Sequence, residues 1–209
     1  CCVTPSSCLP ADDLPARCDK PRWPAFVEKP ERFGFDYATT CDGLKDRQDE
    51  VRERNTQIED GVFTAIADPR RRLQAPKIEG VPPALNFAPL ENAANALTQT
   101  AGRYHKAAAG ARASVVNGAT LRTINARLMQ AERQLTDDAG LPKRPWYRHL
   151  LYAPGYYTGY AVKTMPGVRE AIEQKEYTDA EAEITRVAKA LEREVVLLDS
   201  VSAQLEQAR

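Results

Sequence analysis

The chain has 209 residues and a mass of 23.2 kDa, which is enough for one substantial domain with an appended arm. Lys and Arg together number 29, and Asp and Glu also number 29, so the formal net charge is zero. This balance argues against nucleic acid as the main partner, because phosphate binding needs an excess of basic residues on one face. No apolar run approaches the ~20 residues that a membrane-spanning helix needs, so we expect no membrane segment.

Residues 1–34 differ in composition from the rest of the chain. They contain six of the prolines and four of the five cysteines. Proline removes a backbone donor and biases its predecessor away from helix, so we expect an irregular arm here and a separate domain over residues 35–209. No two cysteines have the C-x-x-C spacing of zinc or redox sites. A lipid-modified N-terminal cysteine and an unstructured or foreign arm both fit this composition, and we favour the second.

Helical periodicity begins after the arm. Leu44, Val51 and Ile58 recur every seven residues, which predicts a helix over residues 44–67 that ends at Asp68-Pro69. Residues 68–89 contain five prolines and predict an extended connector over the surface.

A second helix is expected to start near Pro89, because proline fits the first turn of a helix. Asn117-Gly118 interrupts the pattern, and Asn117 is a candidate cap for a third helix that ends at Gly140. The apolar stripe of the third helix has steps of three and four residues: Leu121, Ile124, Leu128, Ala131 and Leu135.

The last helix has the most regular pattern in the chain. A short helix is predicted from Pro166 to about Lys175, and Thr178 followed by Glu181 then matches a capping box. An unbroken apolar seam follows, made of Ile184, Val187, Leu191, Val195, Leu198, Val201 and Leu205. About four long helices without β alternation indicate an all-α helical bundle. The alanine-rich faces allow close helix contacts, within the chain or with a second copy.

Residues 144–167, "RPWYRHLLYAPGYYTGYAVKTMPG", interrupt the bundle pattern, and we call them the crossover segment. They hold five of the eight tyrosines, and their prolines and glycines exclude a continuous helix. The run "YRHLLYAP" fits a short extended stretch. One interpretation is an ordered crossover whose rings plug the bundle, and the other is a recognition loop, since tyrosine combines a rigid apolar body with a polar tip.

The residue types give little sign of independent catalysis. The two histidines, His105 and His149, are far apart, and neither lies in a metal-binding motif. No nucleophile elbow, phosphate-binding loop or dinucleotide fingerprint occurs.

Two stretches carry a family resemblance. "GLPKRPWYRHLLYAP" (140–154) and "GYAVKTMPGVREAIEQ" (159–174) resemble the transferrin-receptor-like dimerisation domain in the C-terminal part of glutamate carboxypeptidase II-like zinc peptidases. The connector region, residues 58–93, is similar to the bacterial branch of that family. Together the resemblance covers roughly residues 35–209.

The resemblance implies a non-catalytic helical domain that forms a homodimer and completes the substrate pocket of a peptidase domain in cis. The relatives bind two zinc ions through that preceding domain, so we expect no cofactor in this chain, and a peptide-like substrate only through the parent enzyme. It also implies a periplasmic or extracellular location, although we recognise no targeting signal in the sequence itself.

The resemblance also suggests ligand-facing residues. In glutamate-specific relatives, a Lys-Tyr pair upstream of the Pro-Gly holds the substrate's terminal carboxylate. Tyr160 matches the tyrosine, whereas Gly159 stands at the lysine position, which puts glutamate specificity in doubt. Tyr157 and Lys163 are the weaker candidates.

Several further expectations follow from the same resemblance. Arg148 and His149 are expected to hold the loop, and the last helix with the segment before it is expected to supply much of the dimer interface. Two alternatives are a free-standing helical interaction module without a peptidase, and an autonomous hydrolase.

Overall fold

The computed structural model describes residues 30–65, 70, 74–113, 117–157, 159 and 161–208. Its elements in chain order are α2 (Pro30–Glu59), α3 (Ala88–Ala113), α4 (Gly118–Leu128), α5 (Ala131–Gln134), β1 (Tyr152–Pro154), β2 (Val162–Thr164), α6 (Pro166–Glu173) and α7 (Tyr177–Gln207). The described residues form a mostly helical domain, as predicted. None of the described helices has the length and apolar character needed to cross a membrane.

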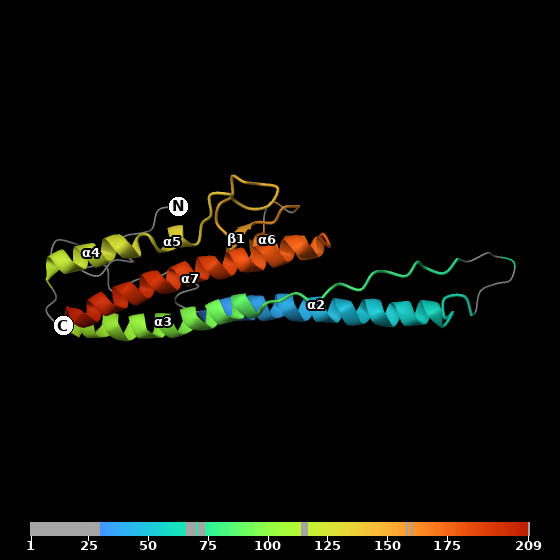
Figure 1. Cartoon of the computed structure of the whole chain (residues 1–209), viewed down its shortest axis with the longest axis horizontal. Coiled ribbons are helices and arrows are strands. Elements are labelled where there is room, and N and C mark those ends of the chain that lie inside the picture. Colours follow the sequence, from blue (N-terminus) through green and yellow to red (C-terminus); the bar gives the residue numbers. More distant parts are fainter. Residues whose placement is uncertain are drawn as a thin grey trace.

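The core lies between α3 and α7, which make the most extensive helix contact. Figure 1 shows them side by side along the molecule, with α4, α5 and α6 on the other face of α7. Leu90, Leu97 and Tyr104 of α3 repeat every seven residues and are at most 1% exposed. Each fully buried side chain of this size contributes about 1.5–3 kcal/mol. Buried alanines on both helices, such as Ala101 and Ala188, let the backbones approach closely, so these alanines are used within the chain, the first of the two alternatives.

The predicted seam of α7 is confirmed as a buried face. Ile184, Leu191, Leu198 and Leu205 are at most 1% exposed and pack in the core. The helix begins at Tyr177, however, and its N-cap is Glu176, without a side-chain cap bond. The predicted capping box is therefore wrong, because both of its residues lie inside the helix. The turn from α6 is tight, with a left-handed Lys175 (φ 62°), so α7 starts before Thr178.

The helix predicted over residues 44–67 is displaced toward the N-terminus. It runs from Pro30 to Glu59, and a turn with a left-handed Gly61 (φ 72°) ends it. The described residues 30–34 are thus helical, although their composition predicted an irregular arm. Residues 1–29 and the predicted stop at Asp68-Pro69 lie outside the described residues. Leu44 and Val51 are buried, whereas Val62 is 53% exposed, because α2 continues past the end of the bundle (Figure 1).

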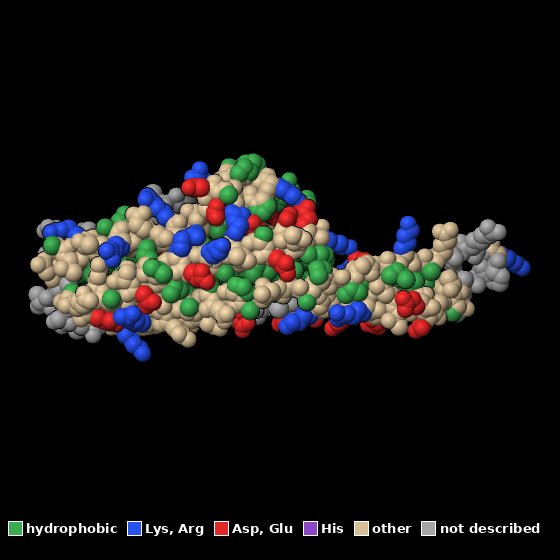
Figure 2. Space-filling view, viewed as in Figure 1, with side chains coloured by type: hydrophobic (Ala, Val, Ile, Leu, Met, Phe, Trp, Pro, Cys, Tyr) green, Lys and Arg blue, Asp and Glu red, His purple; other side chains and the backbone are tan. Residues whose placement is uncertain are grey.

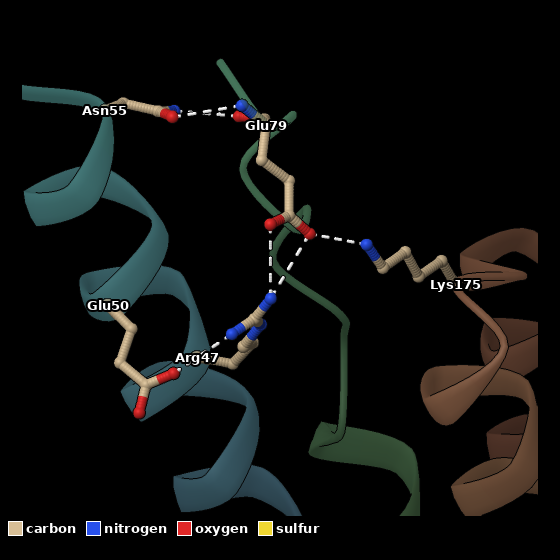
Figure 3. A network of polar contacts seen from close by, with 5 residues as sticks. All are labelled: Arg47, Glu50, Asn55, Glu79 and Lys175. Atoms are coloured by element: carbon tan, nitrogen blue, oxygen red, sulfur yellow. Dashed lines mark hydrogen bonds and ion pairs between the residues drawn. The ribbon is translucent and has the colours of Figure 1, made fainter. Parts of the chain in front are cut away.

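The extended connector runs back along α2. Asn55 of α2 donates to the backbone oxygen of Glu79 at 2.7 Å and accepts from its N–H at 3.0 Å. Arg47 of α2 donates to both oxygens of the Glu79 carboxylate, and Lys175 from the turn between α6 and α7 reaches the same group (Figure 3). These two cations hold the pKa of Glu79 below its usual range, the bond from Lys175 first. The connector is therefore attached to both α2 and the bundle.

The helix predicted over residues 118–140 is interrupted. Asn117 caps α4 as expected, since its side-chain oxygen accepts from Ala119 N at 2.8 Å. The helical ladder then breaks at Met129 and Gln130 before the short α5. Arg193 of α7 donates to the carbonyl of Gln134 and so satisfies the end of α5. The apolar stripe identified the buried face correctly but gave no sign of this break.

Candidate functional site

The crossover segment folds as a small antiparallel hairpin beside α6. Ala153 of β1 pairs with Lys163 of β2, and Gly155 N donates to the carbonyl of Ala161 at 3.0 Å. The extended run predicted from "YRHLLYAP" is confirmed by β1, but the all-α prediction did not include the strand pair. Met165 adopts a left-handed conformation (φ 44°) and turns the chain into α6, which begins at Pro166.

A buried ion pair supports the hairpin. Arg144 donates to both oxygens of the Glu170 carboxylate at 2.8 Å, and the two side chains are 4% and 9% exposed. Arg144 also donates to the carbonyl of Pro154, and the same carboxylate accepts from Tyr156 N at 2.8 Å. One guanidinium nitrogen makes both of these charge-assisted bonds, and Arg144 Nε has no hydrogen-bond partner among the described residues, so the bonds offset only part of the desolvation cost of a buried pair. The pair therefore fixes the start of the hairpin loop relative to α6.

Aromatic rings cover this ion pair. The Arg144 guanidinium carbon lies 5.5 Å from the centroid of the Tyr147 ring and 5.7 Å from that of Tyr156. Such cation–π contacts contribute about 0.5–2 kcal/mol each, depending on desolvation. Tyr157 in turn meets Tyr156 edge-on, with centroids 5.0 Å apart.

The predicted ligand-facing residues differ in how the structure places them. Tyr157 is 71% exposed at the loop tip. Lys163 lies on β2, and its ammonium pairs with Glu173 of α6 at 2.6 Å. Tyr160 lies outside the described residues. Among the described contacts, none joins Tyr157 to Lys163.

Gly159 has a backbone reason to be glycine. Its φ is +68°, a conformation that side-chain-bearing residues rarely adopt, while a Cβ there would meet no atom within 4 Å. A lysine at this position would have room but a strained backbone.

His149 holds the hairpin to α5. Its Nδ1 accepts from Leu151 N and Tyr152 N, which places the ring proton on Nε2, 3.2 Å from the Glu132 carboxylate. The ring stacks on Tyr152 at 3.9 Å, and the Tyr152 hydroxyl donates to the same carboxylate. The hydrogen bond with His149 keeps the pKa of Glu132 below its usual range. The predicted structural role of His149 is confirmed.

Arg148 makes a weaker connection. Its guanidinium lies 3.0 Å from Asp138, but both side chains are exposed, so the pair contributes little. Its backbone oxygen accepts from Asp137 N at 2.9 Å, which attaches the segment through the main chain.

Three buried carboxylates were not predicted from the sequence: Glu170, Glu183 and Glu194. A signal existed for Glu170, which lies in a short helix three residues after Pro-Gly and follows a segment that contains Arg144 and Arg148. The described residues contain no group of three or more His, Cys, Asp and Glu side chains that could hold a metal ion.

The fold and this segment define the class of protein. Residues 85–199 match the family described as the transferrin receptor-like dimerisation domain. The matched range extends from just before α3 into α7 and includes the whole crossover segment. The chain belongs to the transferrin receptor-like dimerisation domain family.

Three relatives are similar over parts of the chain. Probable glutamate carboxypeptidase LAMP1 of Arabidopsis thaliana is 41% identical over 85 residues, which are 37% of this chain and 12% of that protein. A probable glutamate carboxypeptidase of Arthroderma benhamiae is 33% identical over 109 residues, 52% of this chain and 15% of the relative. The inactive zinc metalloprotease C354.09c of Schizosaccharomyces pombe is 35% identical over 80 residues, 38% of this chain and 10% of the relative. The match thus spans only about an eighth of the length of these relatives.

Proposed function

We propose that this chain is the non-catalytic dimerisation domain of a glutamate carboxypeptidase-like zinc peptidase, and that it forms a homodimer. The family match over residues 85–199 carries this proposal. The relatives named as carboxypeptidases support the parent class, and the catalytic zinc ions would be held by a domain outside this chain.

The surface for self-association is best placed on the crossover segment. The apolar seam of α7 is used in the chain's own core, so little of it remains for a partner. Trp146 and Val162 are each 73% exposed, and Tyr157 is 71% exposed. Figure 2 shows hydrophobic side chains at the crest where this segment projects from the bundle. Exposed aromatic anchors of this kind are typical of protein interfaces.

The same hairpin is proposed to complete the substrate pocket of the peptidase domain. Tyr157 offers a ring and a hydroxyl at the loop tip, and Tyr160 matches the tyrosine of the family pair. Lys163 is a weaker ligand for a substrate carboxylate, because it already pairs with Glu173. Substrates with a terminal carboxylate would therefore bind without the full charge-assisted contact of glutamate-specific relatives.

Light scattering on the purified chain tests the proposal. A homodimer has twice the 23.2 kDa of the single chain. A particle of single-chain mass at high micromolar concentration would contradict it.

A second candidate is a free-standing helical interaction module without a peptidase. The chain covers only 10% to 15% of the length of each relative, which fits a domain of a longer peptidase and a free-standing module equally well. The coding sequence upstream separates them, since a reading frame with zinc-binding motifs supports the first and its absence supports the second.

A further inference from the structure

Glu194 is a buried carboxyl without a partner. It lies in α7 and is 0% exposed, and neither carboxylate oxygen has a hydrogen-bond partner among the described residues. The other buried glutamates differ, because Arg144 donates hydrogen bonds to Glu170 and Arg186 donates one to Glu183. An isolated carboxylate is costly to bury, so the fold favours the neutral acid at Glu194.

The neighbouring charges act in the same direction. Glu132 lies on α5, which packs against α7, and its negative charge adds to burial, the larger cause, in raising the pKa of Glu194 to about 7. Glu132 is itself held by His149 and Tyr152 of the crossover segment.

Among the described residues, no cation on the elements packed against α7 makes a hydrogen bond to the Glu194 carboxyl. Tyr104 of α3 is buried and is not a cation. Arg122 and Arg127 of α4 are exposed. Arg193, the adjacent residue on α7, donates to the carbonyls of Gln134 and Thr136.

We propose that Glu194 is a pH-sensitive switch that couples the packing of α5 and the crossover segment to the protonation of this single carboxyl. In the neutral form, α7 packs against α5. In the ionised form, two carboxylates, Glu194 and Glu132, repel each other across that contact. Because Glu132 anchors His149 and Tyr152, the weakened contact loosens the hairpin that carries Tyr157 and Lys163. This inference does not depend on the proposed function.

Two backbone hydrogen bonds report on this contact. Leu150 N donates to the carbonyl of Leu135 at 3.0 Å, and Asp137 N donates to that of Arg148 at 2.9 Å. Both join the crossover segment to the chain that follows α5. Their amide exchange therefore measures the local opening directly.

The experiment is amide hydrogen exchange at pH 5.5 and 8.5, corrected for the intrinsic rates. In the unmodified chain, protection of the Leu150 and Asp137 amides should fall at least tenfold at the higher pH. In Glu194→Gln it should change less than twofold. Glu192→Gln, an exposed neighbour on α7, is the matched control and should behave like the unmodified chain. Equal loss of protection in the unmodified chain and Glu194→Gln, or no loss in either, would overturn the proposal.

A titration of Glu194 in the unmodified chain tests the proposal even if the Glu194→Gln variant fails to fold. The carboxyl carbon resonance of Glu194 should titrate with a midpoint near neutral pH. A midpoint close to the ordinary value for glutamate would refute the switch.

Discussion

Arg144 and Glu170 form a buried ion pair in which one guanidinium nitrogen contacts both carboxylate oxygens at 2.8 Å. The pair joins the start of the crossover segment to α6 beneath the rings of Tyr147 and Tyr156. The pair also binds backbone groups at the end of β1, at Pro154, and just after it, at Tyr156. The position of the exposed loop therefore depends on two side chains that are themselves hidden from solvent.

Removal of one partner should be strongly destabilising. Glu170→Ala leaves the Arg144 guanidinium buried without its counter-charge, which costs about 3–5 kcal/mol. Urea unfolding followed by circular dichroism measures the loss. The exposed Glu173→Ala, on the same helix, should cost less than about 1 kcal/mol. Equal effects of the two substitutions would show that the buried pair has no special role.

Gly140 should tolerate no side chain. Its φ is +68°, and an added Cβ would lie 2.2 Å from the carbonyl oxygen of Pro145. Gly140→Ala is expected to cost more than about 2 kcal/mol, since backbone strain and a clash with main chain combine. Gly159→Ala is the matched control, with the same φ but open space, and should cost only about 1 kcal/mol. A thermal melt of both variants tests the difference, and similar melting temperatures would contradict it.

The stability of the chain should fall as pH rises toward neutrality. The pKa of Glu194 is raised to about 7 in the fold, against an ordinary value of 4.5. Between these values the folded chain binds more protons than the unfolded chain, so the free energy of unfolding decreases with pH, and the decrease stops above about pH 7. The total loss is about 3 kcal/mol.

Glu194→Gln isolates this contribution. The variant should match the unmodified chain near pH 4.5 and exceed its stability at pH 8, as measured by chemical denaturation at both values. Parallel curves for the two proteins across this range would show that Glu194 ionises normally.

The ligand-facing residues can be tested in a full-length parent that carries the peptidase domain. Lys163→Ala and Tyr160→Phe should raise KM for substrates with a terminal carboxylate by up to about tenfold while kcat changes little, because each removes a binding contact. Lys189→Ala, an exposed lysine of α7, is the control and should change neither constant. An unchanged KM in both Lys163→Ala and Tyr160→Phe would contradict the proposal that the hairpin lines the substrate pocket.

Periodicity predicted the buried faces of the helices better than their ends. The seam of α7 from Ile184 to Leu205 was read correctly, because burial follows the helical repeat. The break after Leu128 was not predicted, since Ala131 and Leu135 continue the same repeat across it. The start of α7 was misplaced because a left-handed Lys175 and the preceding turn decide it, not the residues of the capping box.

The candidate site was predictable only in outline. The cluster of tyrosines marked the segment, and the resemblance assigned roles to Tyr157 and Lys163. The partnership of Arg144 with Glu170 depends on tertiary contacts across 26 residues, which no local pattern reports. The burial of Glu194 was not predictable from local sequence either, because glutamate is usually exposed to solvent, whereas Glu194 is fully buried.

We propose that the chain self-associates through the crossover segment. Light scattering coupled to size-exclusion chromatography should give a mass of about twice 23.2 kDa for the unmodified chain. Trp146→Glu should weaken the dimer at least tenfold, because it replaces an exposed aromatic side chain of the crossover segment with a charge. Ile78→Glu, at a 59% exposed position on the connector, should leave the dimer intact. A single-chain mass for the unmodified protein, or a dimer that resists Trp146→Glu but not Ile78→Glu, would contradict this account.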